Sequence, residues 1–77
     1  MKTYLRFASD RLDEAEPYAS KTSAVAAYRR VVDECINYGS TPPEASLHYA
    51  NSNEELREYP DFVLSMGPRG GVKIERA

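Results

Sequence analysis

The chain of 77 residues has one cysteine, one histidine and no tryptophan. Cys35 alone can form neither an internal disulfide nor a cysteine-based zinc site, and the lone His48 excludes a catalytic pair of histidines. No apolar stretch has the length of a signal peptide or approaches the roughly 20 residues of a membrane span. We therefore expect a cytoplasmic protein that is not an enzyme and holds no metal or cofactor.

The composition that is present fits a single folded domain over residues 1–77, with 42% hydrophobic and 29% charged residues. A chain of this size buries only roughly 60% of the surface it exposes when unfolded, which leaves little room for an internal active site. The net charge of -2 gives no overall argument for a nucleic-acid or membrane-surface protein. The charge balance therefore favours protein partners.

One long periodic segment, residues 20–39, predicts a helix over about 21–38. Ser20 or Thr22 can cap its first turn, and Gly39 can close its last turn in the left-handed conformation. Apolar residues recur at spacings of three and four, which places them on one stripe that needs a sheet to cover. The stripe consists of Ala24, Val25, Tyr28, Val31, Val32, Cys35 and Ile36.

The opposite side of this helix is charged. Arg29 and Asp33, and likewise Arg30 and Glu34, stand four residues apart, which predicts two exposed ion pairs of roughly 0.2 to 0.5 kcal/mol each. We interpret this side as a solvated face that pairs within itself.

Four segments alternate as half-buried strands do: residues 2–8, 44–50, 61–66 and 72–76. A short helical turn is expected near 53–58. Together these elements predict an α+β fold, a two-layer sandwich with the helix across one face of a mainly antiparallel four-stranded sheet. The other face should be open and polar, and would carry Lys2, Tyr4, Arg6, Ser46, His48, Ser65, Lys73 and Glu75.

Two acidic runs stand out between these elements. One lies in the loop expected at residues 9–17 and the other around the short helical turn. Carboxylates spread over a rigid scaffold can occupy a basic groove on a partner in place of phosphates. The candidate partner-binding residues are Asp10, Asp13, Glu14 and Glu16 in the first run, and Glu54, Glu55, Glu58 and Asp61 in the second.

Two other features have simpler interpretations. Cys35 should face the sheet while His48 points away, so a Cys–His dyad is disfavoured. The glycine-rich run 67–71 lacks the lysine and hydroxyl ending of a P-loop and precedes a strand, so it predicts a hairpin turn. Arg69 at its exposed tip is a reasonable contact residue.

The run EYPDFVLSMGPRGG near the carboxy terminus looks like small bacterial proteins carried by phages, plasmids and other mobile elements. In size and plain α+β make-up the chain is also similar to the small anti-CRISPR proteins. That similarity covers the architecture alone and carries over no residue. It implies a non-enzymatic inhibitor that docks on a multisubunit CRISPR effector complex and blocks its binding of target DNA.

Two alternatives stand beside this hypothesis. A small nucleic-acid-binding protein would use the open sheet face and hairpin tip, with Tyr4 stacking on bases and Arg6, His48, Arg69 and Lys73 contacting phosphates. A homodimeric regulatory subunit would instead pack its exposed sheet face on its twin.

Overall fold

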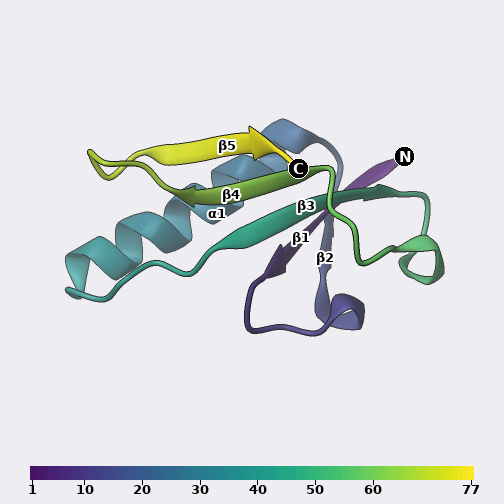
Figure 1. Ribbon diagram of the computed structural model, residues 1–77, viewed down its shortest axis with the longest axis horizontal. Helices are drawn as coiled ribbons and strands as arrows, with labels where there is room; N and C mark the ends of the chain where they lie inside the picture. The colour runs from purple at the N-terminus through teal and green to yellow at the C-terminus, as the bar shows by residue number, and fades with distance from the viewer.

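The computed structural model describes residues 1–77 as one helix packed on an antiparallel five-stranded sheet (Figure 1). The strand order is β2-β1-β3-β4-β5, so the first strand of the chain lies inside the sheet. The elements are β1 (Lys2–Phe7), β2 (Glu16–Tyr18), α1 (Lys21–Asn37), β3 (Ala45–Ala50), β4 (Phe62–Met66) and β5 (Val72–Arg76), with single 3₁₀ turns η1 (Leu12–Glu14) and η2 (Asn53–Glu55).

The ends of α1 confirm the expected caps. Ser20 is the N-cap, and its hydroxyl accepts a hydrogen bond from the Ser23 backbone N–H at 3.2 Å. Gly39 adopts a φ of 72° beyond the last turn, and its N–H donates to the Ile36 carbonyl at 3.1 Å. α1 has 17 residues and lacks the length and apolar character that a membrane-spanning helix needs.

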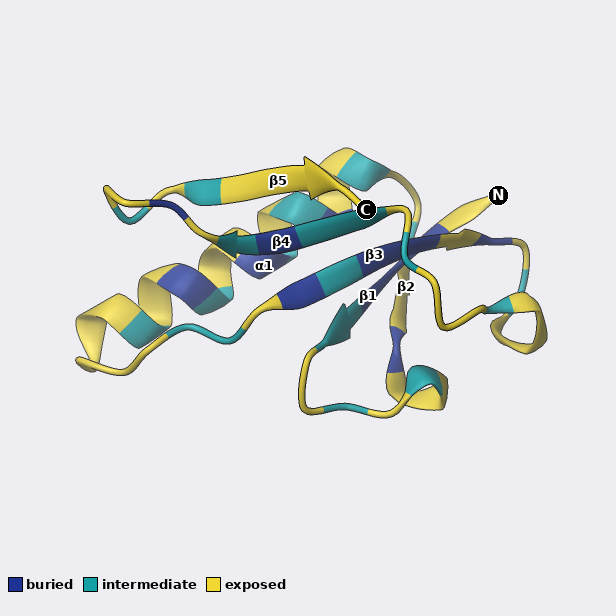
Figure 2. Ribbon diagram, in the orientation of Figure 1, coloured by how far each residue is buried: buried dark blue, intermediate teal, exposed yellow.

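The main core lies between α1 and the sheet. Its largest fully buried side chains are Tyr28 and Val32 from the helix and Leu47 and Leu64 from the central strands. The Tyr28 hydroxyl donates to the Pro43 carbonyl at 2.6 Å, which fixes the helix to the linker that leads into β3. Figure 2 shows this burial concentrated in the middle of the helix and in β1 and β3.

The fifth strand corrects the expected four-stranded sheet. β2 begins in the predicted loop 9–17 and extends one residue beyond it, and one of its three paired residues is Pro17. Because the Ala8 N–H donates to the Glu44 carbonyl, the alternation of the ladder points the Tyr4 backbone towards β3. Pro17, opposite Tyr4 on the other side, therefore needs no N–H bond to β1, which is how an edge strand tolerates proline.

The face of the sheet away from α1 is not fully open, which corrects a second prediction. Tyr4 is 3% exposed and His48 is 2% exposed, although both point away from the helix. The segments around η1 and η2 turn back across this face and bring Ala15 and Leu56 against Tyr4 and Ala50. They form a second, smaller core.

The β4–β5 part of that face stays accessible, as does Lys2 at the start of β1. Lys73 and Glu75 are exposed and Ser65 is half-buried. The Lys73 ammonium pairs with the Glu75 carboxylate at 2.8 Å along the same strand. The face predicted to be one polar surface is therefore divided into a covered half and a smaller exposed half.

Candidate functional site

Arg6 joins the two segments that cover the sheet. From near the carboxy-terminal end of β1 its Nε donates to the Asp10 carbonyl at 3.0 Å, and its Nη1 donates to the Glu58 carboxylate at 2.9 Å. The Arg6 side chain is 21% exposed, so its guanidinium lies between the segments rather than in solvent. One residue thus fixes both acidic runs to the sheet.

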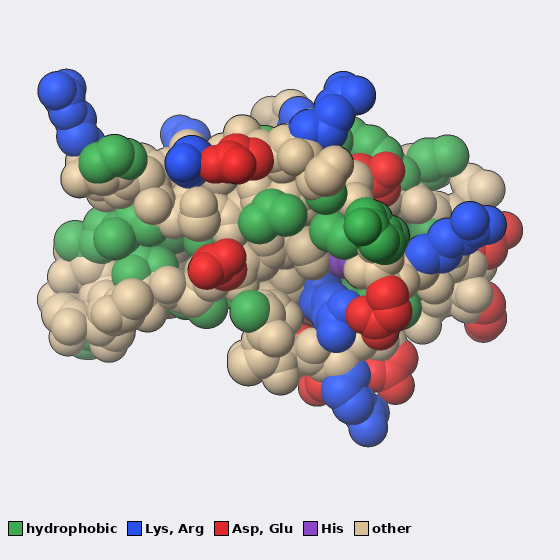
Figure 3. Space-filling model, viewed as in Figure 1, with side chains coloured by type: hydrophobic (Ala, Val, Ile, Leu, Met, Phe, Trp, Pro, Cys, Tyr) green, Lys and Arg blue, Asp and Glu red, His purple; other side chains and the backbone are tan.

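We name the surface formed by residues 8–16 and 51–61 the acidic face. Together with Arg6 these segments hold eight carboxylates and three arginines, a formal charge of -5. The rest of the chain holds seven lysines and arginines against four carboxylates, a charge of +3. The small net charge therefore hides a strong separation, and acidic side chains gather at the right and lower right of Figure 3.

Two carboxylates of the second acidic run hold the backbone in place, as Glu14 does in the first run by accepting from the Arg11 N–H at 2.8 Å. Asp61 accepts a hydrogen bond from the Tyr49 N–H at 2.8 Å, which extends the β3 ladder beyond the end of β4. Glu55 accepts from the Asn51 N–H at 3.1 Å. These two residues therefore contribute to the fold as well as to the charge of the surface.

The other carboxylates of the acidic face lie at its surface. Arg11 pairs with Asp13 at 3.2 Å and with Glu14 at 3.6 Å, and all three side chains are more than half exposed, so these pairs add little stability. The side chains of Asp10 and Glu54 make no hydrogen bond or ion pair within the chain. The exposed members are Asp13, Glu14, Glu16, Glu54 and Glu58, and Asp10 is half-buried.

His48 ties the second segment to β3. Its Nδ1 lies 2.9 Å from the Arg57 carbonyl oxygen, which can only accept, so Nδ1 carries the proton and donates. Its Nε2 then accepts from the Ser46 hydroxyl at 2.8 Å. Burial lowers the pKa of His48, a direction that nearby Arg6 reinforces and that the bond to Arg57 opposes.

The hydrogen-bond order Ser46 to His48 to a carbonyl is that of a serine–histidine dyad. Neither residue lines any of the three hollows on the surface of the chain. A carbonyl substrate would have no cavity beside the serine hydroxyl. The pair is best understood as the bond that fastens the Arg57 segment to the sheet.

Three of the five residues that the nucleic-acid hypothesis relies on are buried or paired in the structure. Tyr4 and His48 are buried under the acidic face, and Arg6 pairs with Glu58, so these three residues do not form the open binding face that was predicted. Arg69 and Lys73 remain exposed on the β4–β5 hairpin. Alternation along a strand shows which side a residue faces, but it gives no indication of what covers that side.

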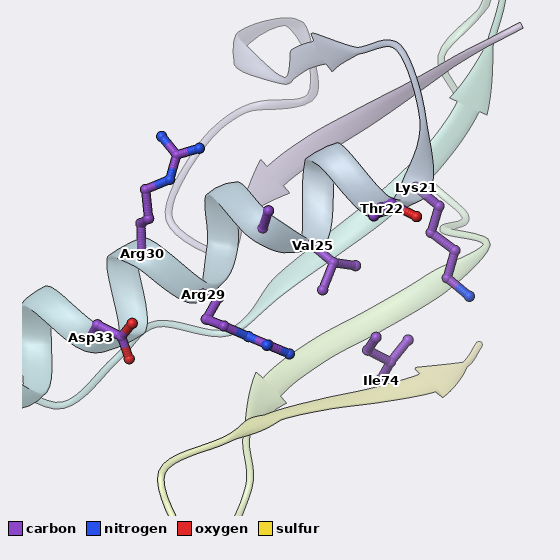
Figure 4. Close-up of a pocket in the computed structure, with 8 residues that line it drawn as sticks. Lys21, Thr22, Val25, Arg29, Arg30, Asp33 and Ile74 are labelled. Atoms are coloured by element: carbon purple, nitrogen blue, oxygen red, sulfur yellow. The ribbon is translucent and has the colours of Figure 1, made fainter.

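A groove that the sequence did not reveal runs between α1 and β5. It has a volume of about 480 Å³ and an apolar floor of Val25, Ala26 and Ile74. Arg29 extends from the helix towards Ile74, and Lys21 lies at one end with its ammonium 3.8 Å from the centre of the Phe62 ring (Figure 4). The sequence held one indication of this groove: a single helix is too narrow to cover a sheet of four or more strands, so part of the sheet must stay uncovered.

The two ion pairs predicted on α1 do not form. Neither Arg29 with Asp33 nor Arg30 with Glu34 is bridged in the structure. Arg29 extends into the groove instead, and Arg30 and Asp33 also line it (Figure 4). Exposed pairs of this kind gain so little energy that side-chain entropy outweighs the attraction.

Known proteins give no further indication of function. No protein-family model, no curated protein and no solved structure matches the chain. The similarity to the small anti-CRISPR proteins therefore stays a prediction, and the function has to be argued from the chemistry of these surfaces.

Proposed function

We propose that the chain is a non-enzymatic protein-binding inhibitor whose acidic face occupies a basic groove on its partner. The observation that carries this proposal is the joining of two acidic runs, some 40 residues apart in sequence, on one side of the sheet through Arg6 and Tyr4. A basic groove that binds nucleic-acid phosphates is the natural target for such a surface. The first partner to test is a CRISPR effector complex, whose target-DNA binding the protein would block.

The physical basis is electrostatic complementarity, presented on a backbone that is already ordered in the free protein. A face with a formal charge of -5 attracts a basic groove over about 10 Å at ordinary salt and speeds association. The backbone under the face is held by hydrogen bonds of Arg6 and His48, so little chain entropy is lost on binding. The affinity should therefore fall as salt is raised.

The test is inhibition of target-DNA binding by a purified, guide-loaded CRISPR effector complex, followed by fluorescence anisotropy of labelled DNA. The variant carries Asp13→Lys and Glu54→Lys, one exposed substitution in each acidic segment. We expect wild-type protein to lower DNA binding and this variant to lose at least about tenfold in potency, because two charges change sign at the contact.

A matched control carries Glu34→Lys and Glu44→Lys, which change the net charge equally but lie outside the acidic face. Its potency should stay close to that of the wild type. Equal loss in both double variants would show that net charge alone matters, and full potency of the first would show that another surface binds. A wild-type chain with no effect on any effector complex would remove this partner class.

A further inference from the structure

The outer edge of β5 has no neighbouring strand, because β5 ends the sheet. Beyond the register of β4 and β5, the Gly67 N–H donates to the Gly71 carbonyl. Bonded and non-bonded pairs alternate along an antiparallel ladder. Counting from that bond, the N–H and C=O groups that point away from β4 belong to Val72, Ile74 and Arg76.

The opposite edge of the sheet, formed by β2, has almost no free backbone hydrogen-bonding groups for a further strand. Glu16 and Tyr18 direct their backbone groups to β1, and Pro17 between them faces outward. Proline has no N–H, so this edge presents a single carbonyl to another strand. Of the two edges, only β5 can accept a further strand.

β5 is complementary to itself. When a second copy runs antiparallel with Ile74 on a two-fold axis, Val72 faces Arg76 of the second copy and the three outward residues exchange their backbone bonds. The same register places Lys73 opposite Glu75 of the second copy, twice. A slip by two residues would place two lysines or two glutamates opposite each other, so the charges select one register.

The groove beside β5 fits the same arrangement. Ile74 is 39% exposed at its floor, and a second Ile74 across the axis would cover it. A two-fold axis perpendicular to the sheet keeps both helices on one side, so the two grooves meet above the joined edges. The apolar floor that one copy leaves uncovered is then shared by two.

We propose that β5 pairs with β5 of a second copy, in the register centred on Ile74, to form a symmetric dimer with one continuous sheet. Assembly stops at two copies because both free edges are then the proline-blocked β2. The dimer is independent of the proposed function, since the acidic face covers β1 and β3. It places both acidic faces on the same side of the joined sheet.

Sedimentation equilibrium of the full chain over a range of concentrations tests this dimer. Wild-type protein should be dimeric. Ile74→Pro removes an outward N–H but no bond to β4, and it should give a folded monomer by circular dichroism. Ile74→Ala keeps that N–H and should weaken the dimer less.

The charge pairs supply a rescue experiment that a misfolded variant cannot imitate. Lys73→Glu should raise the dimer dissociation constant by roughly tenfold, and adding Glu75→Lys should restore it. A wild-type chain that stays monomeric at about 1 mM would overturn the proposal, because its dimer dissociation constant would then be higher than that of a specific dimer. A dimer indifferent to Ile74→Pro and Lys73→Glu would overturn it as well.

Discussion

Each face of the sheet is covered over part of its area, but by different means. Under α1 the core is apolar, and Leu47, Leu64, Tyr28 and Val32 are fully buried. On the other face Tyr4 meets only small or half-buried apolar neighbours, and polar bonds of other side chains complete the cover. The face under α1, the helix face, should therefore contribute most of the stability. The face under the η1 and η2 segments, the loop face, can change its exposed residues at low cost in stability and so can serve binding.

The largest expected effect compares the same substitution on both faces. Leu47→Ala should lower the free energy of unfolding by about 2 to 5 kcal/mol, because Leu47 is fully buried in the main core. Leu56→Ala, at a half-buried site under the acidic face, should cost about 1 kcal/mol. Urea denaturation of both variants measures the difference, and equal losses would contradict the comparison.

A second comparison uses two buried tyrosines. Tyr28→Phe removes the hydroxyl that donates to the Pro43 carbonyl, and should cost about 1 to 1.5 kcal/mol. The Tyr4 hydroxyl makes no hydrogen bond within the chain, so Tyr4→Phe should stay within about 0.5 kcal/mol of the wild type. Thermal unfolding followed by circular dichroism distinguishes them. A larger loss at Tyr4 would reverse the assignment of stability to the helix face.

The loop face should weaken in mild acid. Burial lowers the pKa of His48 below 6.5, so the unfolded chain takes up a proton at higher pH than the folded chain. Its contribution to stability is complete above pH 6.5 and is lost as the pH falls from 6.5 through the folded pKa. Unfolding free energies across this range should fall in the wild type and less in His48→Gln. Identical slopes would mean that carboxylates, not the only histidine, set the pH dependence.

The smallest effect belongs to the ion pair that joins the acidic segments. Glu58 is 76% exposed, so a double-mutant cycle of Arg6→Ala and Glu58→Ala should give a coupling energy of about 0.2 to 1 kcal/mol. The coupling should shrink at high salt. Urea denaturation of the four proteins at two salt concentrations measures it, and a value unaffected by salt would argue that the contact is not electrostatic.

Much of the fold could be predicted because its signals are local. The Ser20 cap and the left-handed Gly39 act within a few residues, and both are confirmed. The predicted stripe of α1 is buried at Ala24, Tyr28 and Val32, but its last member, Ile36, is 48% exposed. β2 has no such local signal, because a strand of three residues with Pro17 at its centre is too short to show alternation. The fold class can be predicted from the spacing of apolar residues and the length of each segment. The fifth strand can be recognised only once it is known which segment pairs with the outer side of β1.

The candidate site was harder to predict because its geometry is not local. The eight acidic residues were identified from sequence, but their meeting depends on β1 lying beside β3 and on Arg6 reaching Glu58. Tyr4 and His48 were placed on the correct side and wrongly thought exposed, because nothing in their own segments encodes the loops that cover them. The backbone groups of β5 likewise follow from the ladder and not from side-chain type.

The central place of β1 has a consequence for how the protein folds during synthesis. The first strand made can form a hairpin with β2 as soon as Tyr18 is available, yet its other neighbour, β3, follows only after the helix. Pairs such as Thr3 with Tyr49 close a long stretch of chain and are slow to form. Until they do, Leu5 has no core. The strand made last, β5, completes the sheet, so the edge that can recruit a second copy appears only when the fold beneath it is finished.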